Sequence, residues 1–174
     1  MKIATNSPKI TYTGLPKFQT IVDNRLIRGR AVSCPWRLYK MKQEGITQII
    51  DLRNTSVFQR RLEKIFTKLL GIKYINYKYP HRLNTLPEST FFNKVNQTIL
   101  DNSGKTYIHC QYGKRRTGIC VAIYEKLHTK KTKEEIIDNI YKLGFQELKD
   151  NPNSFKIKKL QSIFNDFMKK YYND

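Results

Sequence analysis

The residues best suited to chemistry lie in one short stretch, His109 to Gly118, which reads His-Cys-Gln-Tyr-Gly-Lys-Arg-Arg-Thr-Gly. Cys110 follows an apolar, strand-like run and precedes a predicted helix, so its thiol would lie at a helix N-terminus. The helix dipole and the nearby guanidinium of Arg116 would lower the pKa of that thiol. A thiolate can attack phosphorus and carry the phosphoryl group as a covalent intermediate. The stretch therefore predicts phosphoryl-transfer chemistry with Cys110 as the nucleophile.

The residues after Cys110 are suited to holding a phosphate. Their backbone N–H groups can curl around an anion as a nest, and Gly113 permits backbone angles that a side chain would penalise. Arg116, six residues after Cys110, can place its guanidinium fork on two phosphate oxygens. We therefore expect a substrate-binding role for the rest of the loop: His109, Gln111, Tyr112, Gly113, Lys114 and Arg115.

Two further side chains have expected roles in this loop. The hydroxyl of Thr117 can reach back to the sulfur and stabilise it as the leaving group of a second step. His109 is expected to hold the loop through its ring nitrogens rather than to act as a base. Cys110, Arg116 and Thr117 are thus the predicted catalytic residues.

The stretch resembles the signature of the protein-tyrosine and dual-specificity phosphatases. Further segments resemble the flanks of small, single-domain members from bacteria and fungi, over about residues 20 to 148: Leu26–Arg30, Gly45–Arg53 and Lys142–Phe145. The resemblance implies a compact α/β phosphatase fold and a mechanism without metal or other cofactor. It also implies the roles given above for Cys110, Arg116 and Thr117.

The sequence departs from the family at the general acid. Many members carry an aspartate on a loop ahead of the cysteine, whereas no Asp or Glu occurs here between Glu63 and Glu88. Such acids contribute roughly 10²–10⁴ in rate, so the difference matters. Three alternatives stay open: His81 acts as the acid, Glu88 reaches the site instead of capping a helix together with Thr85, or no acid is needed because the leaving group is a good one.

Three functions follow as hypotheses. The first is a phosphatase for phosphotyrosine, and also for phosphoserine and phosphothreonine. The second is a phosphatase for a polyphosphorylated non-protein substrate, such as an inositol pyrophosphate, a phosphoinositide or an RNA 5′-triphosphate. Lys114 and Arg115 favour it if they face the substrate, and they carry no information if they only face solvent. The third is a pseudophosphatase that binds phosphorylated ligands without turnover.

Apolar, β-branched runs alternate with helical patterns along the chain. This alternation predicts an α/β fold with a central, mostly parallel sheet flanked by helices, and the phosphate loop between a strand and a helix. The expected strands are 24–30, 46–52, 72–79 and 105–109; the expected helices are 35–44, 57–70, 85–100, 116–127, 133–143 and 155–171. Residues 1–174 form one domain, with a core of about 20–148 and a C-terminal helix at 155–171.

The composition of the chain indicates its expected cellular compartment and partners. The chain has three cysteines in no disulfide or zinc-ligand spacing, and no apolar run of the length of a membrane span. We therefore expect a cytoplasmic monomer. The net charge of +19 comes from 23 Lys and 10 Arg, a bias also typical of AT-rich genomes, so nucleic acid is not a favoured partner. The Lys-rich C-terminal helix could lie on a membrane, but its apolar spacing favours packing into the core.

Overall fold

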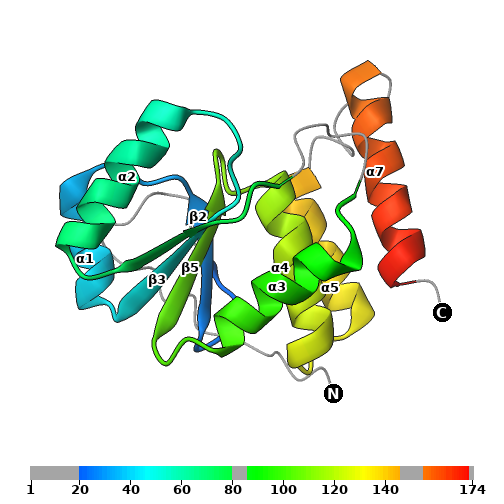
Figure 1. Ribbon diagram of the computed structural model, residues 1–174. Helices are drawn as coiled ribbons and strands as arrows, with labels where there is room; N and C mark the ends of the chain where they lie inside the picture. The colour runs from blue at the N-terminus through cyan, green and yellow to red at the C-terminus, as the bar shows by residue number, and fades with distance from the viewer. Residues whose placement is uncertain (1–19, 80–85, 146–154, 173–174) are drawn as a thin grey trace.

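The fold is seen in a computed structural model that describes residues 20–79, 86–145 and 155–172. Four strands and a two-residue edge strand alternate with helices along the chain (Figure 1). The strands are β1 Thr20–Ile21, β2 Leu26–Arg30, β3 Ile46–Asp51, β4 Lys73–Asn76 and β5 Lys105–Cys110. The helices are α1 Pro35–Gln43, α2 Val57–Leu69, α3 Ser89–Leu100, α4 Arg115–His128, α5 Lys133–Ile140, a π-helix Tyr141–Phe145 and α7 Phe155–Tyr171.

The sheet has the strand order β1-β2-β5-β3-β4. Strands β2, β5, β3 and β4 are parallel, and only β1 at the edge is antiparallel. The predicted α/β fold with a mostly parallel sheet is therefore confirmed. Strand β5 lies between β2 and β3 in the sheet. Cys110, the last residue of β5, therefore has a neighbouring strand on each side.

Helices cover both faces of the sheet. Figure 1 shows α1 and α2 on one face, and α3, α4, α5 and α7 on the other. Alternate residues of β5 enter separate cores: Tyr107 packs with Leu38 and Met41 of α1, and Ile108 packs with Ile119 and Ile123 of α4. The period-2 alternation of a strand thus builds two cores from one apolar run.

Most predicted elements agree with the structure to within a few residues, and three details differ. The edge strand β1 was not predicted, because two residues give no periodic signal. Helix α3 begins later than predicted, at Ser89, with Glu88 itself at the N-cap. Thr85, the other residue of the predicted capping box, lies outside the described residues. Pro87 disfavours helical backbone in the residue before it, which delays the start. The capping box that does form joins Thr132 and Glu135 at the start of α5.

The C-terminal helix α7 packs into the main core. Phe164, Phe167 and Tyr172 are buried with residues of α4 and α5, and the ring of Phe167 lies tilted against Tyr171 and edge-on to Tyr172. The sequence expectation of a core-packing helix is confirmed. Among the described residues, none of the helices combines the length and the apolar character that a membrane span requires.

Truncating Phe167 tests this packing. Because its side chain is fully buried, Phe167→Ala is expected to lower the free energy of unfolding by about 3–5 kcal/mol, measured by urea denaturation. Leu127→Ala on α4, at a side chain that is 56% exposed, is the matched control and should change it by less than about 0.5 kcal/mol. Equal effects of the two variants would mean that α7 is not part of the core.

Candidate active site

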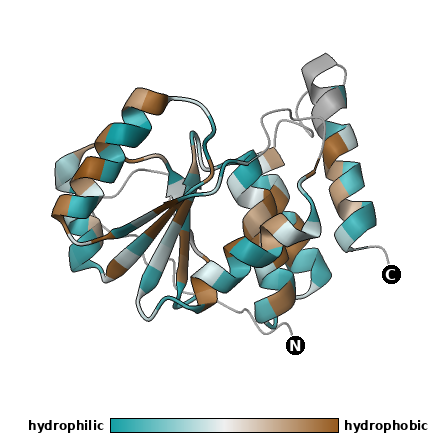
Figure 2. Ribbon diagram, in the orientation of Figure 1, coloured by the Kyte–Doolittle hydropathy of each residue, from teal (hydrophilic) through white to brown (hydrophobic). Residues whose placement is uncertain are grey.

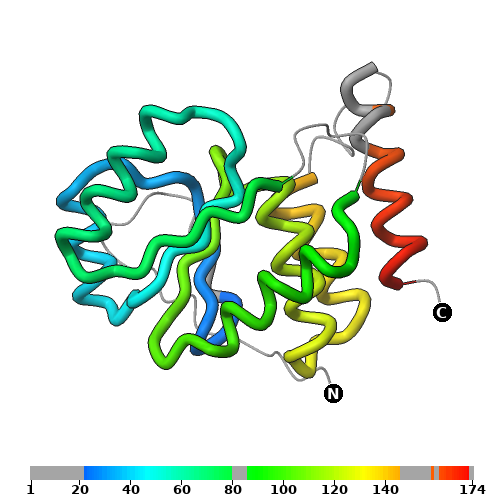
Figure 3. The backbone as a smooth tube through the Cα atoms, in the orientation of Figure 1, coloured from blue at the N-terminus to red at the C-terminus, as the bar shows by residue number. Residues whose placement is uncertain are grey.

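The loop from Gln111 to Lys114 connects the end of β5 to the first turn of α4, as the chain trace shows (Figure 3). Cys110, the last residue of β5, is buried. Gly113 has a φ of +68°, which favours glycine. A Cβ there would also lie 2.2 Å from the carbonyl oxygen of Gly29 in β2. Gly113 therefore serves two constraints, the backbone angle and the close approach of two backbones.

Arg28 of β2 fixes the orientation of this loop. Its buried Nη2 donates hydrogen bonds to the carbonyl oxygens of Gly113, at 2.8 Å, and Lys114, at 3.0 Å. In a trans peptide the N–H group points away from the carbonyl. The N–H groups of Lys114 and Arg115 therefore point away from Arg28. Turned this way, successive N–H groups can form an anion nest at the N-terminus of α4.

A buried acid balances the charge of Arg28. Burial lowers the pKa of Arg28 to about 10, and the carboxylate of Glu125 on α4 opposes that shift. Glu125 is itself buried and forms an ion pair with Lys131. A buried guanidinium without such compensation would be strongly unfavourable. The charge of Glu125 favours the charged form of Arg28, which supports the loop.

The thiol of Cys110 is biased toward the thiolate. Burial would raise its pKa, but the hydroxyl and amide of Thr117, the guanidinium of Arg116 and the amide of Tyr112 together hold the pKa below 9.0. The buried hydroxyl of Thr117 has no other hydrogen-bond partner among the described residues. The structure thus brings the three predicted catalytic residues together.

Arg116 is anchored at the end of the neighbouring strand. Its Nη1 donates to the carbonyl oxygen of Leu52, 3.3 Å away, just beyond β3. The amide of Tyr79 donates to the same carbonyl, also at 3.3 Å. The chain therefore passes the guanidinium of Arg116 before it enters residues 80–85. His81 lies in that segment, outside the described residues.

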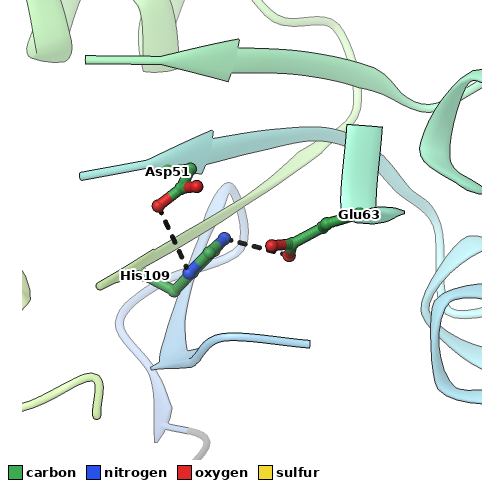
Figure 4. Close-up of side chains that lie close together, drawn as sticks. All are labelled: Asp51, Glu63 and His109. Carbon is green, nitrogen blue, oxygen red and sulfur yellow. Dashed lines mark ion pairs between the residues drawn. The ribbon is translucent and has the colours of Figure 1, made fainter. Parts of the chain in front are cut away.

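His109 is enclosed by acidic side chains from β3 and α2 (Figure 4). Its Nε2 lies 3.1 Å from Oε1 of Glu63, and its Nδ1 lies 3.8 Å from Oδ1 of Asp51. Burial would lower the pKa of His109, but the two carboxylates outweigh it and raise the pKa above 6.5. Nδ1 also lies 3.2 Å from the carbonyl oxygen of Cys110. His109 is thus a buried anchor, biased toward its charged form, for the strand that carries Cys110.

Asp51, Glu63 and His109 are close enough together to share a metal ion. Arg53 already provides the positive charge here, because it donates hydrogen bonds to both carboxylates. A raised pKa also favours the protonated imidazole, which has no lone pair for a metal. The residues do not fit a metal centre, and we assign the group to support of β5.

The remaining predicted residues differ in exposure. Tyr112 is 67% exposed and Lys114 is exposed, whereas Gln111 and Arg115 are half-buried. Glu88 is exposed at the start of α3, where the hydroxyl of Thr90 contacts its carboxylate. Lys114 and Tyr112 are therefore the loop side chains most accessible to a substrate.

Sequence reasoning assigned no role to Arg28, nor to the group Asp51, Arg53 and Glu63. The signal was present in part: Arg28 lies inside the apolar strand β2, and Asp51 ends the apolar strand β3. A charge in a strand that is buried on both faces needs a partner, so each of these residues indicates a buried polar contact. The identity of those partners depends on which elements pack together.

The shape of the chain matches several solved structures over most of its length. The core catalytic domain of the PP-IP phosphatase SIW14 from S. cerevisiae matches with a TM-score of 0.64 and 21% identity, over 88% of this chain and 96% of that one. PTPMT1 matches with a TM-score of 0.61 and 20% identity, over 88% and 95%. The active form of Tk-PTP matches with 0.57 and 14%, over 88% and 98%. The chain has the fold of the cysteine-dependent phosphatases. By sequence, no family model and no curated protein matches it.

The bias toward the thiolate can be measured by alkylation. In a Cys34→Ser background, which removes the exposed thiol, iodoacetamide should modify Cys110 with a pH midpoint below 9.0. Cys120 should not react, because its burial raises the thiol pKa. Thr117→Val removes the hydroxyl and should move the midpoint upward. An unchanged midpoint in Thr117→Val would show that the hydroxyl does not stabilise the sulfur.

Proposed function

We propose that this protein is a phosphatase that works through a phosphocysteine intermediate. In the first step the thiolate of Cys110 forms a bond to phosphorus while the bond from phosphorus to the leaving oxygen breaks. The guanidinium of Arg116 and the loop N–H groups take up charge on the other three oxygens. The observation that carries the proposal is the lowered pKa of Cys110 beside Thr117 and Arg116 at the start of α4.

In the second step a water molecule attacks phosphorus, the sulfur–phosphorus bond breaks, and inorganic phosphate leaves. The electron pair returns to sulfur, where the hydroxyl of Thr117 can donate a hydrogen bond to it. No change of oxidation state occurs in either step. His109 takes no proton in this scheme, because it is buried and held between Glu63 and Asp51.

The charge around the loop supports a polyphosphorylated substrate as one candidate. Lys114 is exposed on the loop, and Arg30 is exposed at the end of β2, opposite Cys110 in the sheet register. Lys78 is exposed beside Tyr79. Cations beyond the nest can bind phosphate groups other than the reacting one. The yeast structure with this fold is that of a PP-IP phosphatase.

The exposed ring of Tyr112 supports phosphotyrosine as the other candidate. An aromatic side chain next to the phosphate nest can stack on a phenyl ring, and such contacts contribute about 0.5–1.5 kcal/mol beyond the buried area. Alkyl phosphates such as phosphoserine lack a ring for that contact.

Turnover tests the mechanism and ranks the substrates. With a chelator present, we expect hydrolysis of p-nitrophenyl phosphate, of a phosphotyrosine peptide and of an inositol pyrophosphate, followed by phosphate release. Cys110→Ser should abolish all three activities and keep ligand binding, because the hydroxyl is a much weaker nucleophile. Unchanged activity in that variant would exclude the cysteine mechanism. Ligand binding without turnover by the unmodified protein would identify a pseudophosphatase.

The leaving group tests the general acid. Without an acid, aryl phosphates and phosphoanhydrides should react more than about 100-fold faster than alkyl phosphates, since an acid contributes roughly 10²–10⁴. His81→Asn should then leave the pH profile of kcat unchanged. Loss of a limb near pH 6.5 in that variant would instead identify His81 as the acid.

A further inference from the structure

The solvent face of α2 carries two parallel lines of side chains. Phe58, Ile65 and Leu69 form an apolar line, and they are 73%, 53% and 76% exposed. Arg61, Lys64 and Lys68 form a basic line beside it, and all three are exposed. At 3.6 residues per turn, both sets fall on the same half of the helix. Large apolar side chains at such exposure do not stabilise an isolated monomer.

Helix α1 extends this face. Trp36 is 63% exposed, its ring stacks 5.7 Å from that of Tyr39, and Lys40 lies over the indole. The two helices run side by side on the same face of the sheet (Figures 1 and 3). Lys42 of α1 donates a hydrogen bond to the carbonyl of Leu70, just after α2. Helices α1 and α2 are therefore in contact. We call their exposed side chains the α1–α2 surface: Trp36, Tyr39, Phe58, Arg61, Lys64, Ile65, Lys68 and Leu69.

All exposed charge on this surface is positive. Within α1 and α2 the only acidic residue is Glu63, which is buried against Arg53 and His109. Figure 2 shows hydrophobic and hydrophilic stretches alternating along α2. Aromatic and aliphatic side chains beside lysine and arginine are typical of helices that lie in the interface of an anionic bilayer. There the apolar side chains enter the acyl boundary and the cations meet the headgroups.

We propose that the α1–α2 surface docks on an anionic membrane surface. The charge complementarity favours a bilayer, because its headgroups can meet Arg61, Lys64 and Lys68 at once. Both helices start at the sheet edge where Cys110 lies, since α1 follows β2 and α2 follows β3 in the parallel sheet. Docking would hold that edge close to the bilayer. The proposal does not depend on the catalytic function, because binding alone tests it.

Trp36 is a natural probe, because it is the only tryptophan of the chain. Its fluorescence should shift to the blue, and become protected from acrylamide, when the full-length protein meets vesicles of phosphatidylserine mixed with phosphatidylcholine. Vesicles of phosphatidylcholine alone should give little change. Binding in co-sedimentation without any change at Trp36 would contradict the proposed orientation.

Matched variants distinguish the contribution of this surface to vesicle binding from the contribution of the net charge. Lys64→Glu with Lys68→Glu should weaken vesicle binding by at least about 25-fold, from about fivefold per lost basic side chain. Lys130→Glu with Lys169→Glu changes the net charge equally. These lysines lie between α4 and α5 and on α7, outside the surface, so this pair should weaken binding far less. If the two pairs of variants weakened vesicle binding equally, net charge alone would explain the binding, and the proposal would be overturned.

The apolar line has its own pair of variants. Phe58→Ser with Leu69→Ser should weaken binding by about tenfold or more, since each side chain would lose apolar burial in the bilayer. Leu127→Ser, at an apolar position on α4 that is 56% exposed, should leave binding unchanged. Thermal unfolding checks that each variant is folded. Absence of vesicle binding by the unmodified protein, or self-association through this face, would also overturn the proposal.

Discussion

The site depends on the two hydrogen bonds from Arg28 to the carbonyls of Gly113 and Lys114. A loop that binds an anion must turn its N–H groups inward, and its carbonyls must then find donors elsewhere. Arg28 supplies those donors from the neighbouring strand. Because the guanidinium is buried, Glu125 must accompany it, and Lys131 pairs with Glu125 in turn. The loop is thus supported by a chain of charges that reaches from β2 across α4.

A second group of charges supports β5 from the other face of the sheet. His109 points toward the α1–α2 side, where Asp51 and Glu63 enclose it and Arg53 binds both carboxylates. The two groups lie on either side of the strand that carries Cys110. A one-residue slip of β5 would turn His109 away from Asp51 and Glu63 and leave those charges without it. The buried charges therefore help to fix the register of Cys110, and this specificity compensates for their cost in desolvation.

Helix α2 has two faces with different roles. Its buried face provides Glu63 to His109, while its solvent face carries apolar and basic lines with no acidic residue. Glu63, whose carboxylate lies next to His109, is thus kept away from the outer surface. The chain has a net charge of +19, and its buried charge network is nevertheless compact. The acidic side chains of that network, Asp51 and Glu63, are paired with Arg53 inside the molecule, where water is excluded.

The sequence by itself determined the local features of this protein. The alternation of strands and helices, the glycine at a positive φ and the spacing of Cys110, Arg116 and Thr117 are all encoded over short distances, where periodicity and chain geometry are sufficient. The tertiary structure decided which distant charges meet. Nothing in the local pattern pairs Arg28 with Gly113, or Glu63 with His109, because each contact joins elements far apart in the chain. It also decided which face of α2 is exposed, since burial depends on what packs against a helix and amphipathic spacing alone does not name that partner.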